Sequence, residues 1–128
     1  MQSYIYIGMA GFFGAITRYA LSGWTGALFE GRFPAGTAAV NIIGSLLLGF
    51  IYTLSMERAV LSPEVRLALT VGFLGSFTTF STFSLESYNL MREGSFSMAL
   101  LNIVLNLFAG IAAVFIGVVL AKILYGVK

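Results

Sequence analysis

Six hydroxyl side chains and three phenylalanines stand together between Gly75 and Glu86, in the run Gly-Ser-Phe-Thr-Thr-Phe-Ser-Thr-Phe-Ser-Leu-Glu. The sequence around this run is apolar and typical of segments buried in hydrocarbon. Hydroxyls can satisfy backbone groups freed where a helix breaks, and irregular backbone at membrane depth is tolerated only where protein buries it or a water-filled path meets it. The run is therefore the first candidate for a binding or permeation site.

The three phenylalanines of this run, Phe77, Phe80 and Phe83, recur every third residue. Aromatic residues at helical spacing more often pack than bind, but the surrounding hydroxyls favour a site here. A phenyl ring has a positive edge, so rings presented edge-on could coordinate an anion weakly without a fixed charge. Weak binding at several sites is what fast permeation requires.

Three amides also interrupt apolar stretches. Asn41 lies in Ala-Ala-Val-Asn-Ile-Ile, and a buried amide in lipid needs partners. Its partner could be a neighbouring helix or, through the NH2 group, an anion. Asn102 and Asn106 lie four residues apart with Gly110 one turn further, so the three share a helix face. A polar stripe of this kind favours a pore lining over a lipid-facing surface.

The composition places the chain among integral membrane proteins. Of 128 residues, 59% are hydrophobic and 9% charged, and neither cysteine nor histidine is present. Thiol nucleophiles, disulfides and imidazole bases are thereby excluded, and five glutamates are the only carboxylates, so the chain is not expected to be an enzyme. The seven basic residues are scattered, so the pI near 9.2 indicates membrane topology and not nucleic-acid binding.

Four stretches are long enough to cross a bilayer, which takes about 20 helical residues. They cover about residues 4–28, 34–56, 63–92 and 95–125, and Ser62 is a plausible N-cap for the third. The third stretch is too long for one straight crossing. The connectors leave no room for a second domain, so we expect residues 1–128 to form a single all-α integral membrane domain. The first helix should remain in the mature protein, because no basic residue precedes it as in a signal peptide.

Two charges lie inside the predicted helices. Arg18 is a fixed positive charge in the first helix, and Glu86 is a carboxylate near the end of the third. Either side chain can snorkel to an interface or pair within the fold. For Glu86 a vestibule or structural role is favoured.

The remaining basic residues predict a weak orientation preference. With four crossings the two termini share a side, which holds four basic residues against two on the other; the four are Arg58, Arg66, Lys122 and Lys128, and the two are Arg32 and Arg92. The chain is therefore expected to insert both ways round and to pair with an inverted copy of itself. Stripes of small residues could pack within the bundle or between copies; they are Gly8, Gly11 and Gly14, then Ser45 and Gly49, and then Ala109, Ala113 and Gly117.

Three segments of the chain stand out as motifs: Gly-Ala-Ile-Thr-Arg-Tyr at 14–19, Gly-Thr-Ala-Ala-Val-Asn-Ile-Ile-Gly-Ser at 36–45, and Gly-Phe-Leu-Gly-Ser-Phe-Thr-Thr-Phe-Ser-Thr-Phe-Ser at 72–84. Together these segments resemble the Fluc family of bacterial fluoride channels. The resemblance implies four transmembrane helices with the third broken near its centre, assembled as an antiparallel homodimer with two pores. It also implies a protein of the bacterial inner membrane that lets fluoride leave the cytoplasm passively and so protects the cell.

The resemblance also assigns site residues. The pore phenylalanines of the family fall on Phe80 and Phe83, and its pore asparagine falls on Asn41. Its central sodium ion, held by backbone carbonyls, falls on Gly75 and Thr78, and freed carbonyls at a helix break do need such a partner. The other pore candidates are Thr79, Ser81 and Thr82 beside the break, and Asn102, Asn106 and Gly110 on the fourth helix, where the family usually carries hydroxyls.

Two other classes of protein remain as alternatives. A small proton-coupled multidrug antiporter also forms an inverted dimer, but it needs a carboxylate buried in the membrane, and the first helix here has none. Glu86 is a poor substitute because it lies near the end of the third helix. A structural assembly subunit would explain the small-residue stripes but not six hydroxyls beside a helix break.

Overall fold

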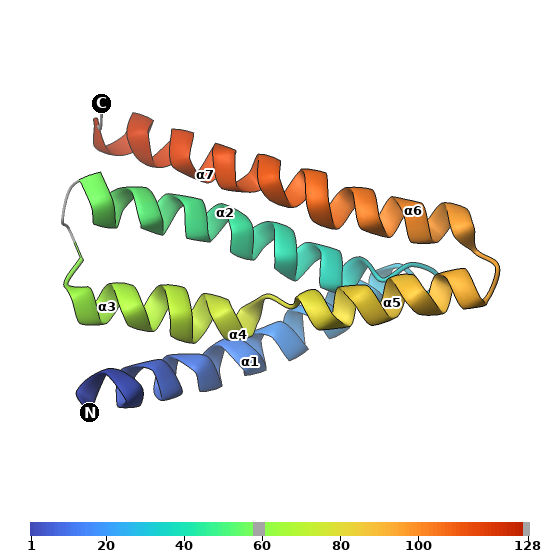
Figure 1. The fold of residues 1–128 in the computed structure, drawn as a ribbon, viewed down its shortest axis with the longest axis horizontal. Coiled ribbons are helices and arrows are strands. Elements are labelled where there is room, and N and C mark those ends of the chain that lie inside the picture. The colour runs from blue at the N-terminus through green and yellow to red at the C-terminus, as the bar shows by residue number, and fades with distance from the viewer. Residues whose placement is uncertain (58–60, 127–128) are drawn as a thin grey trace.

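Four helical rods joined by short connections make up the protein (Figure 1). The computed structural model describes residues 1–57 and 61–126. The first two rods are α1 (Gln2–Leu28) and α2 (Ala35–Glu57). The third consists of α3 (Pro63–Leu67), the π-helical η1 (Ala68–Leu74), α4 (Gly75–Phe77) and α5 (Phe80–Arg92). The fourth consists of α6 (Phe96–Val104), the π-helical η2 (Leu105–Ala109) and α7 (Gly110–Tyr125).

The ends of the rods agree with the predicted stretches to within two residues, because local sequence sets them. Ser62 caps α3 as predicted, and its Oγ accepts a hydrogen bond from the Val65 N–H at 3.3 Å. Between α1 and α2, Glu30 and Gly31 both have positive φ angles, of 52° and 69°. This tight turn returns the chain along α1 without a long loop.

Three rods are long and apolar enough to cross a membrane, so the chain is a multi-pass membrane protein; they are Ala35–Met56, Pro63–Arg92 and Phe96–Tyr125. The helix α1 is also long, at 27 residues, but its glycines, tyrosines and Arg18 make it less apolar, and it is not among the three. Four helices are therefore present as expected, whereas the membrane crossing of α1 stays a prediction.

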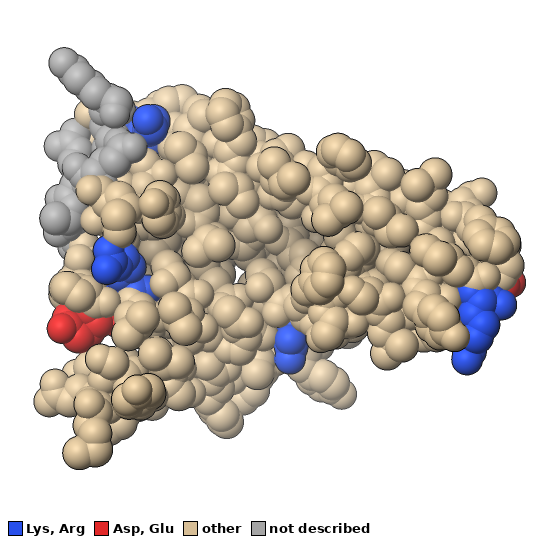
Figure 2. All heavy atoms as spheres, in the orientation of Figure 1, with Lys and Arg blue, Asp and Glu red and all other residues tan. Residues whose placement is uncertain are grey.

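Charged groups gather at the two ends of the molecule, and the long middle of the visible face is almost free of charge (Figure 2). Both chain termini lie at the end where α2 is followed by α3 (Figure 1). The described basic residues Arg66 and Lys122 belong to that end, whereas Arg58 and Lys128 lie outside the described residues. At the other end lie Arg92, the last residue of α5, and Arg32 in the α1–α2 connection, which pairs with Glu30 at 2.9 Å.

Several of the small residues pack within the protomer. A Cβ added at Gly117 would overlap the Leu46 carbonyl oxygen, and one at Gly49 would overlap the Val114 carbonyl oxygen, so α2 and α7 approach closely through these glycines. Gly14 meets the Phe73 backbone in the same way. Gly14, Gly49 and Gly117 therefore serve packing within the bundle, which was one of the two alternatives for the small-residue stripes. At Gly8, in contrast, an added methyl group would meet no atom of another described helix within 4 Å, so this residue leaves its face of α1 open toward the described part of the chain.

The buried core lies where the third rod meets α2. Val40, Leu74 and Phe77 are almost fully buried, and the Phe77 ring stacks on Phe73 with centroids 5.7 Å apart. Of the three phenylalanines in the hydroxyl-rich run, Phe77 therefore packs in the core. It holds the segment before the break against α2.

Candidate functional site

The third rod breaks at Thr78 and Thr79, inside the hydroxyl-rich run. Both residues have extended backbones, with φ −90° and ψ 160° at Thr78 and φ −153° and ψ 118° at Thr79. Thr79 then caps α5, because its Oγ1 accepts a hydrogen bond from the Thr82 N–H at 3.2 Å. A hydroxyl residue at this position supplies an acceptor that a helix start otherwise lacks.

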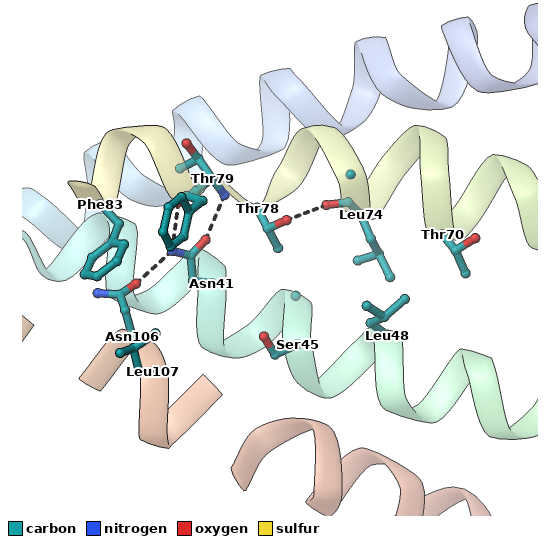
Figure 3. Close-up of a pocket in the computed structure, with 13 residues that line it drawn as sticks. Asn41, Ser45, Leu48, Thr70, Leu74, Thr78, Thr79, Phe83, Asn106 and Leu107 are labelled. Atoms are coloured by element: carbon teal, nitrogen blue, oxygen red, sulfur yellow. Dashed lines mark hydrogen bonds between the residues drawn. The ribbon is translucent and has the colours of Figure 1, made fainter. Parts of the chain in front are cut away.

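One side chain from another rod satisfies the backbone of the break. Asn41 on α2 accepts from the Thr79 N–H through Oδ1 at 2.8 Å and donates to the Thr79 carbonyl through Nδ2 at 3.0 Å (Figure 3). Its Nδ2 also donates to Oδ1 of Asn106 at 2.7 Å. Because unpaired backbone groups are costly in lipid, this amide stabilises the broken conformation.

The break removes the donor that a continuous helix would supply from four backbone carbonyls, those of residues 75–78, and the two predicted sodium ligands are among them. In a continuous helix the Gly75 carbonyl would accept from the Thr79 N–H, and the Thr78 carbonyl would accept from the Thr82 N–H. Those donors are directed instead to Asn41 Oδ1 and to Thr79 Oγ1. The carbonyl oxygens of Gly75 and Thr78, which are ligands of the kind that a hard cation prefers, thus lie close to the break.

A cavity of about 280 Å³ lies beside the break (Figure 3). Its described lining carries no charged side chain and consists of Asn41, Gly44, Ser45, Leu48, Thr70, Leu74, Gly75, Thr78, Thr79, Phe80, Phe83, Asn106 and Leu107. The Phe80 and Phe83 rings meet edge to face, with centroids 5.5 Å apart and planes at 62°. Phe83 is buried, whereas Phe80 is 73% exposed in the protomer.

The six hydroxyls of the run divide into two groups. Ser76, Thr78 and Ser84 each donate to the carbonyl four residues earlier in the chain, so they serve the backbone. The other three, Thr79, Ser81 and Thr82, cluster at the start of α5. Thr79 Oγ1 donates to Thr82 Oγ1 at 2.9 Å and lies 3.4 Å from Ser81 Oγ.

Arg18 and Glu86 lie away from the 280 Å³ cavity. Arg18 lines a separate hollow of about 190 Å³ together with Thr79 and Thr82, so the break segment borders both spaces. Glu86 lines a larger hollow of about 740 Å³ that also includes Arg32 and Thr82. The Glu86 Oε1 atom accepts from Thr37 at 2.7 Å, whereas its buried Oε2 atom has no hydrogen-bond partner among the described residues.

The stripe of Asn102, Asn106 and Gly110 on the fourth rod faces the other helices of the bundle. Asn106 lines the cavity, but Asn102 is fully buried and donates to Ser87 Oγ at 3.0 Å. Asn106 Nδ2 donates to both the side-chain and the backbone oxygen of Asn102, each at 2.9 Å. Gly110 is also buried, against Ser45 of α2.

Two residues of these networks were not anticipated from the sequence. Thr37 lies one turn before Asn41 on α2, and this spacing is the signal that could have marked it. Ser87 lies one turn beyond Phe83, and its hydroxyl donates to the Phe83 carbonyl at 2.9 Å. A single serine in a helix carries no comparable signal, because its partner Asn102 comes from the next rod.

The chain combines membrane-length helices, a third rod that is broken where Asn41 bonds to the Thr79 backbone, and a small uncharged cavity at the break. These features are typical of multi-pass helical membrane proteins in which broken helices place polar groups at membrane depth.

Comparison with known proteins identifies the family. The model of the CrcB-like protein family (camphor resistance, CrcB) matches residues 5–118. Relatives named "Fluoride-specific ion channel FluC" include that of Geotalea uraniireducens, 41% identical over 97% of this chain and 100% of its own length, and that of Citrifermentans bemidjiense, 40% identical over the same shares. The one from Clostridium perfringens is 44% identical over 93% of both chains. The chain therefore belongs to the CrcB family of ion channels, as the resemblance to Fluc proteins indicated, and is not an enzyme.

Proposed function

We propose that this chain is a fluoride-specific ion channel that lets fluoride leave the bacterial cytoplasm passively and so limits fluoride toxicity. The observation that carries the proposal is the uncharged cavity at the break, which is lined by Thr78, Thr79 and the edge-to-face pair Phe80 and Phe83. The names of the relatives supply the identity of the ion.

The chemistry of the cavity suits a small anion that must keep moving. The helix α5 begins at Phe80 and directs its N-terminal N–H groups and the positive end of its dipole toward the break. The edges of the phenyl rings add weak positive potential. Since no charged side chain is among the described lining residues, binding stays weak enough for release.

An antiparallel homodimer with two pores would complete these walls. Phe80 is 73% exposed in the protomer although it lines the cavity, so a single chain does not enclose the path. A second, inverted copy in the inner membrane would cover this face and give two equivalent pores related by a two-fold axis in the membrane plane.

A structural sodium ion fits the freed carbonyls of Gly75 and Thr78. Two copies would together offer four backbone oxygens, a hard-ligand set that suits this cation. When bound, the ion would supply a fixed positive charge near an otherwise neutral cavity. Replacing all sodium in the buffer by N-methyl-D-glucamine should lower the melting temperature of the purified dimer; an unchanged melting temperature would count against a structural ion.

Passive efflux from liposomes tests the function. Vesicles loaded with potassium fluoride and reconstituted with the protein should release fluoride when valinomycin provides a path for potassium, and vesicles loaded with chloride should not. The flux should persist without a pH gradient. Fluoride release that needs no valinomycin, or that stops when the pH gradient is removed, would indicate proton-coupled exchange of the antiporter type instead. Protein-free vesicles are the control.

A further inference from the structure

We propose that Asn102 and Asn106 are positioning residues that act through Asn41. In this proposal a one-way chain of side-chain amides fixes the orientation of the Asn41 amide and holds the break at Thr79. The flux part of the test rests on the proposed channel function, whereas the geometry does not.

The amides form a continuous series of hydrogen bonds. The Thr79 N–H donates to Asn41 Oδ1 at 2.8 Å, Asn41 Nδ2 donates to Asn106 Oδ1 at 2.7 Å, and Asn106 Nδ2 donates to Asn102 Oδ1 at 2.9 Å. From Asn102 the series continues through Ser87, whose Oγ accepts at 3.0 Å. Each amide oxygen accepts from the preceding member and each NH2 group donates to the next.

Two backbone groups fix the direction of this series. At one end the Thr79 N–H can only donate, so Asn41 must present its oxygen there. At the other end Ser87 Oγ donates to the Phe83 carbonyl, which can only accept. Rotating any one amide by 180° would place NH2 against NH2 or oxygen against oxygen. The ends of the series therefore determine the orientation of all three asparagines.

Both ends of the series belong to the first turn of α5. Thr79 caps this helix, and Phe83 lies four residues further on. The amides come from α2 and from the fourth rod, so they tie the turn that carries Phe80 and Phe83 to two other rods. Burial strengthens the tie, because Asn102 is 0% exposed and unsatisfied buried amides are costly.

The NH2 groups of Asn41 and Asn106 already donate hydrogen bonds within the protein. Asn41 Nδ2 donates to the Thr79 carbonyl and to Asn106, and Asn106 Nδ2 donates to two oxygens of Asn102. An anion at Asn41 would have to displace one of these partners. The arrangement thus gives the amides of this chain a role in setting the shape of the break, in place of direct contact with the ion.

A double-mutant cycle separates positioning from ion contact. Asn41→Ala and Asn106→Ala should each slow fluoride flux about tenfold and speed the hydrogen exchange of the Thr79 amide about tenfold, the effect of one lost buried hydrogen bond. The double variant should be no worse than Asn41→Ala alone, because Asn106 acts through Asn41. Independent effects that multiply to about a hundredfold would overturn the proposal and make Asn106 an ion contact.

The exchange measurement stands apart from transport. If the wild type conducts no fluoride, the proposed function fails, but the Thr79 exchange rate in Asn106→Ala still tests the series of amides. A faster rate supports the proposed positioning role, and an unchanged rate overturns it. Asn89→Ala, which removes an amide of α5 outside the series, is the matched control and should leave this rate unchanged. Should Asn106→Ala not fold, the near-isosteric Asn106→Leu fills a similar volume but loses the acceptor for Asn41 and both donors toward Asn102, so it should accelerate exchange likewise; an unchanged rate would again overturn the proposal.

Discussion

The Phe80 and Phe83 rings meet edge to face, yet Phe80 is exposed and Phe83 is buried in the protomer. Replacing either by isoleucine keeps most of the apolar bulk and removes the quadrupole of the ring. If the ring edges contact the ion, each variant should lower fluoride flux by about tenfold or more in liposomes, which corresponds to about 1.4 kcal/mol. Phe115→Ile, at a 68% exposed position of α7, is the matched control and should conduct normally. Wild-type flux in both pore variants with the dimer intact would refute aromatic coordination.

Thr79 combines a cap, a hydroxyl cluster and the backbone that Asn41 holds. Thr79→Ala removes the acceptor of the Thr82 N–H, which should cost about 1 kcal/mol and loosen the first turn of α5. Faster exchange of the Thr82 amide, measured by NMR, is the expected result. Thr79→Ser retains the Oγ acceptor and should exchange like the wild type. Equal acceleration in both variants would mean that the methyl group, and not the cap, orders this turn.

At the scale of the elements, close contact through glycine positions the two rods that carry the amides. Gly117 on α7 meets the Leu46 carbonyl of α2, and Gly49 of α2 meets Val114 of α7. Small residues at such contacts let helix backbones approach in a membrane. This close approach brings Asn41 and Asn106 within hydrogen-bonding distance, so helix packing and the polar network depend on one another.

Gly117→Ala should therefore destabilise the protein by about 1–3 kcal/mol, because the added methyl group forces α2 and α7 apart. Thermal unfolding in detergent measures this effect. Gly8→Ala is the control, since a methyl group there would meet no atom of another described helix within 4 Å, and it should leave the melting temperature of the protomer nearly unchanged. A similar loss of stability in the two variants would argue for a general effect of removing helical glycine.

At the scale of the whole molecule, the weak bias of four basic residues against two between the ends predicts insertion in both orientations. Reporters fused to the C-terminus should appear in comparable amounts on both sides of the inner membrane. Adding about three Lys to one connector should drive the chain to a single orientation.

Such a biased chain should lose fluoride flux when expressed alone and recover it when coexpressed with an oppositely biased version. The recovery follows because the proposed pores lie between inverted partners. Normal flux from one strongly biased variant would exclude the antiparallel dimer, and with it a sodium site shared by Gly75 and Thr78 of two copies.

Much of the architecture was predictable because it depends on residues close together in the chain. Hydrophobic length defined the four rods, Ser62 marked the start of α3, and the hydroxyl-rich run marked the break at Thr78 and Thr79. The three motifs indicated the family. Each of these signals lies within a segment of at most about thirty residues, so no knowledge of helix packing was needed.

Only the tertiary structure decided which partner each polar group meets. Asn41 bonds to Asn106, 65 residues away, and Asn102 bonds to Ser87 on the preceding rod. Helical periodicity gives the face on which a side chain lies but not the rotation of that face toward a particular neighbour. That rotation depends on the close contacts of the rods, such as Gly117 on Leu46, because atoms of two packed helices cannot occupy the same space. The sequence by itself therefore determined where this chain breaks, and the packing of the rods determined which side chains hold the break.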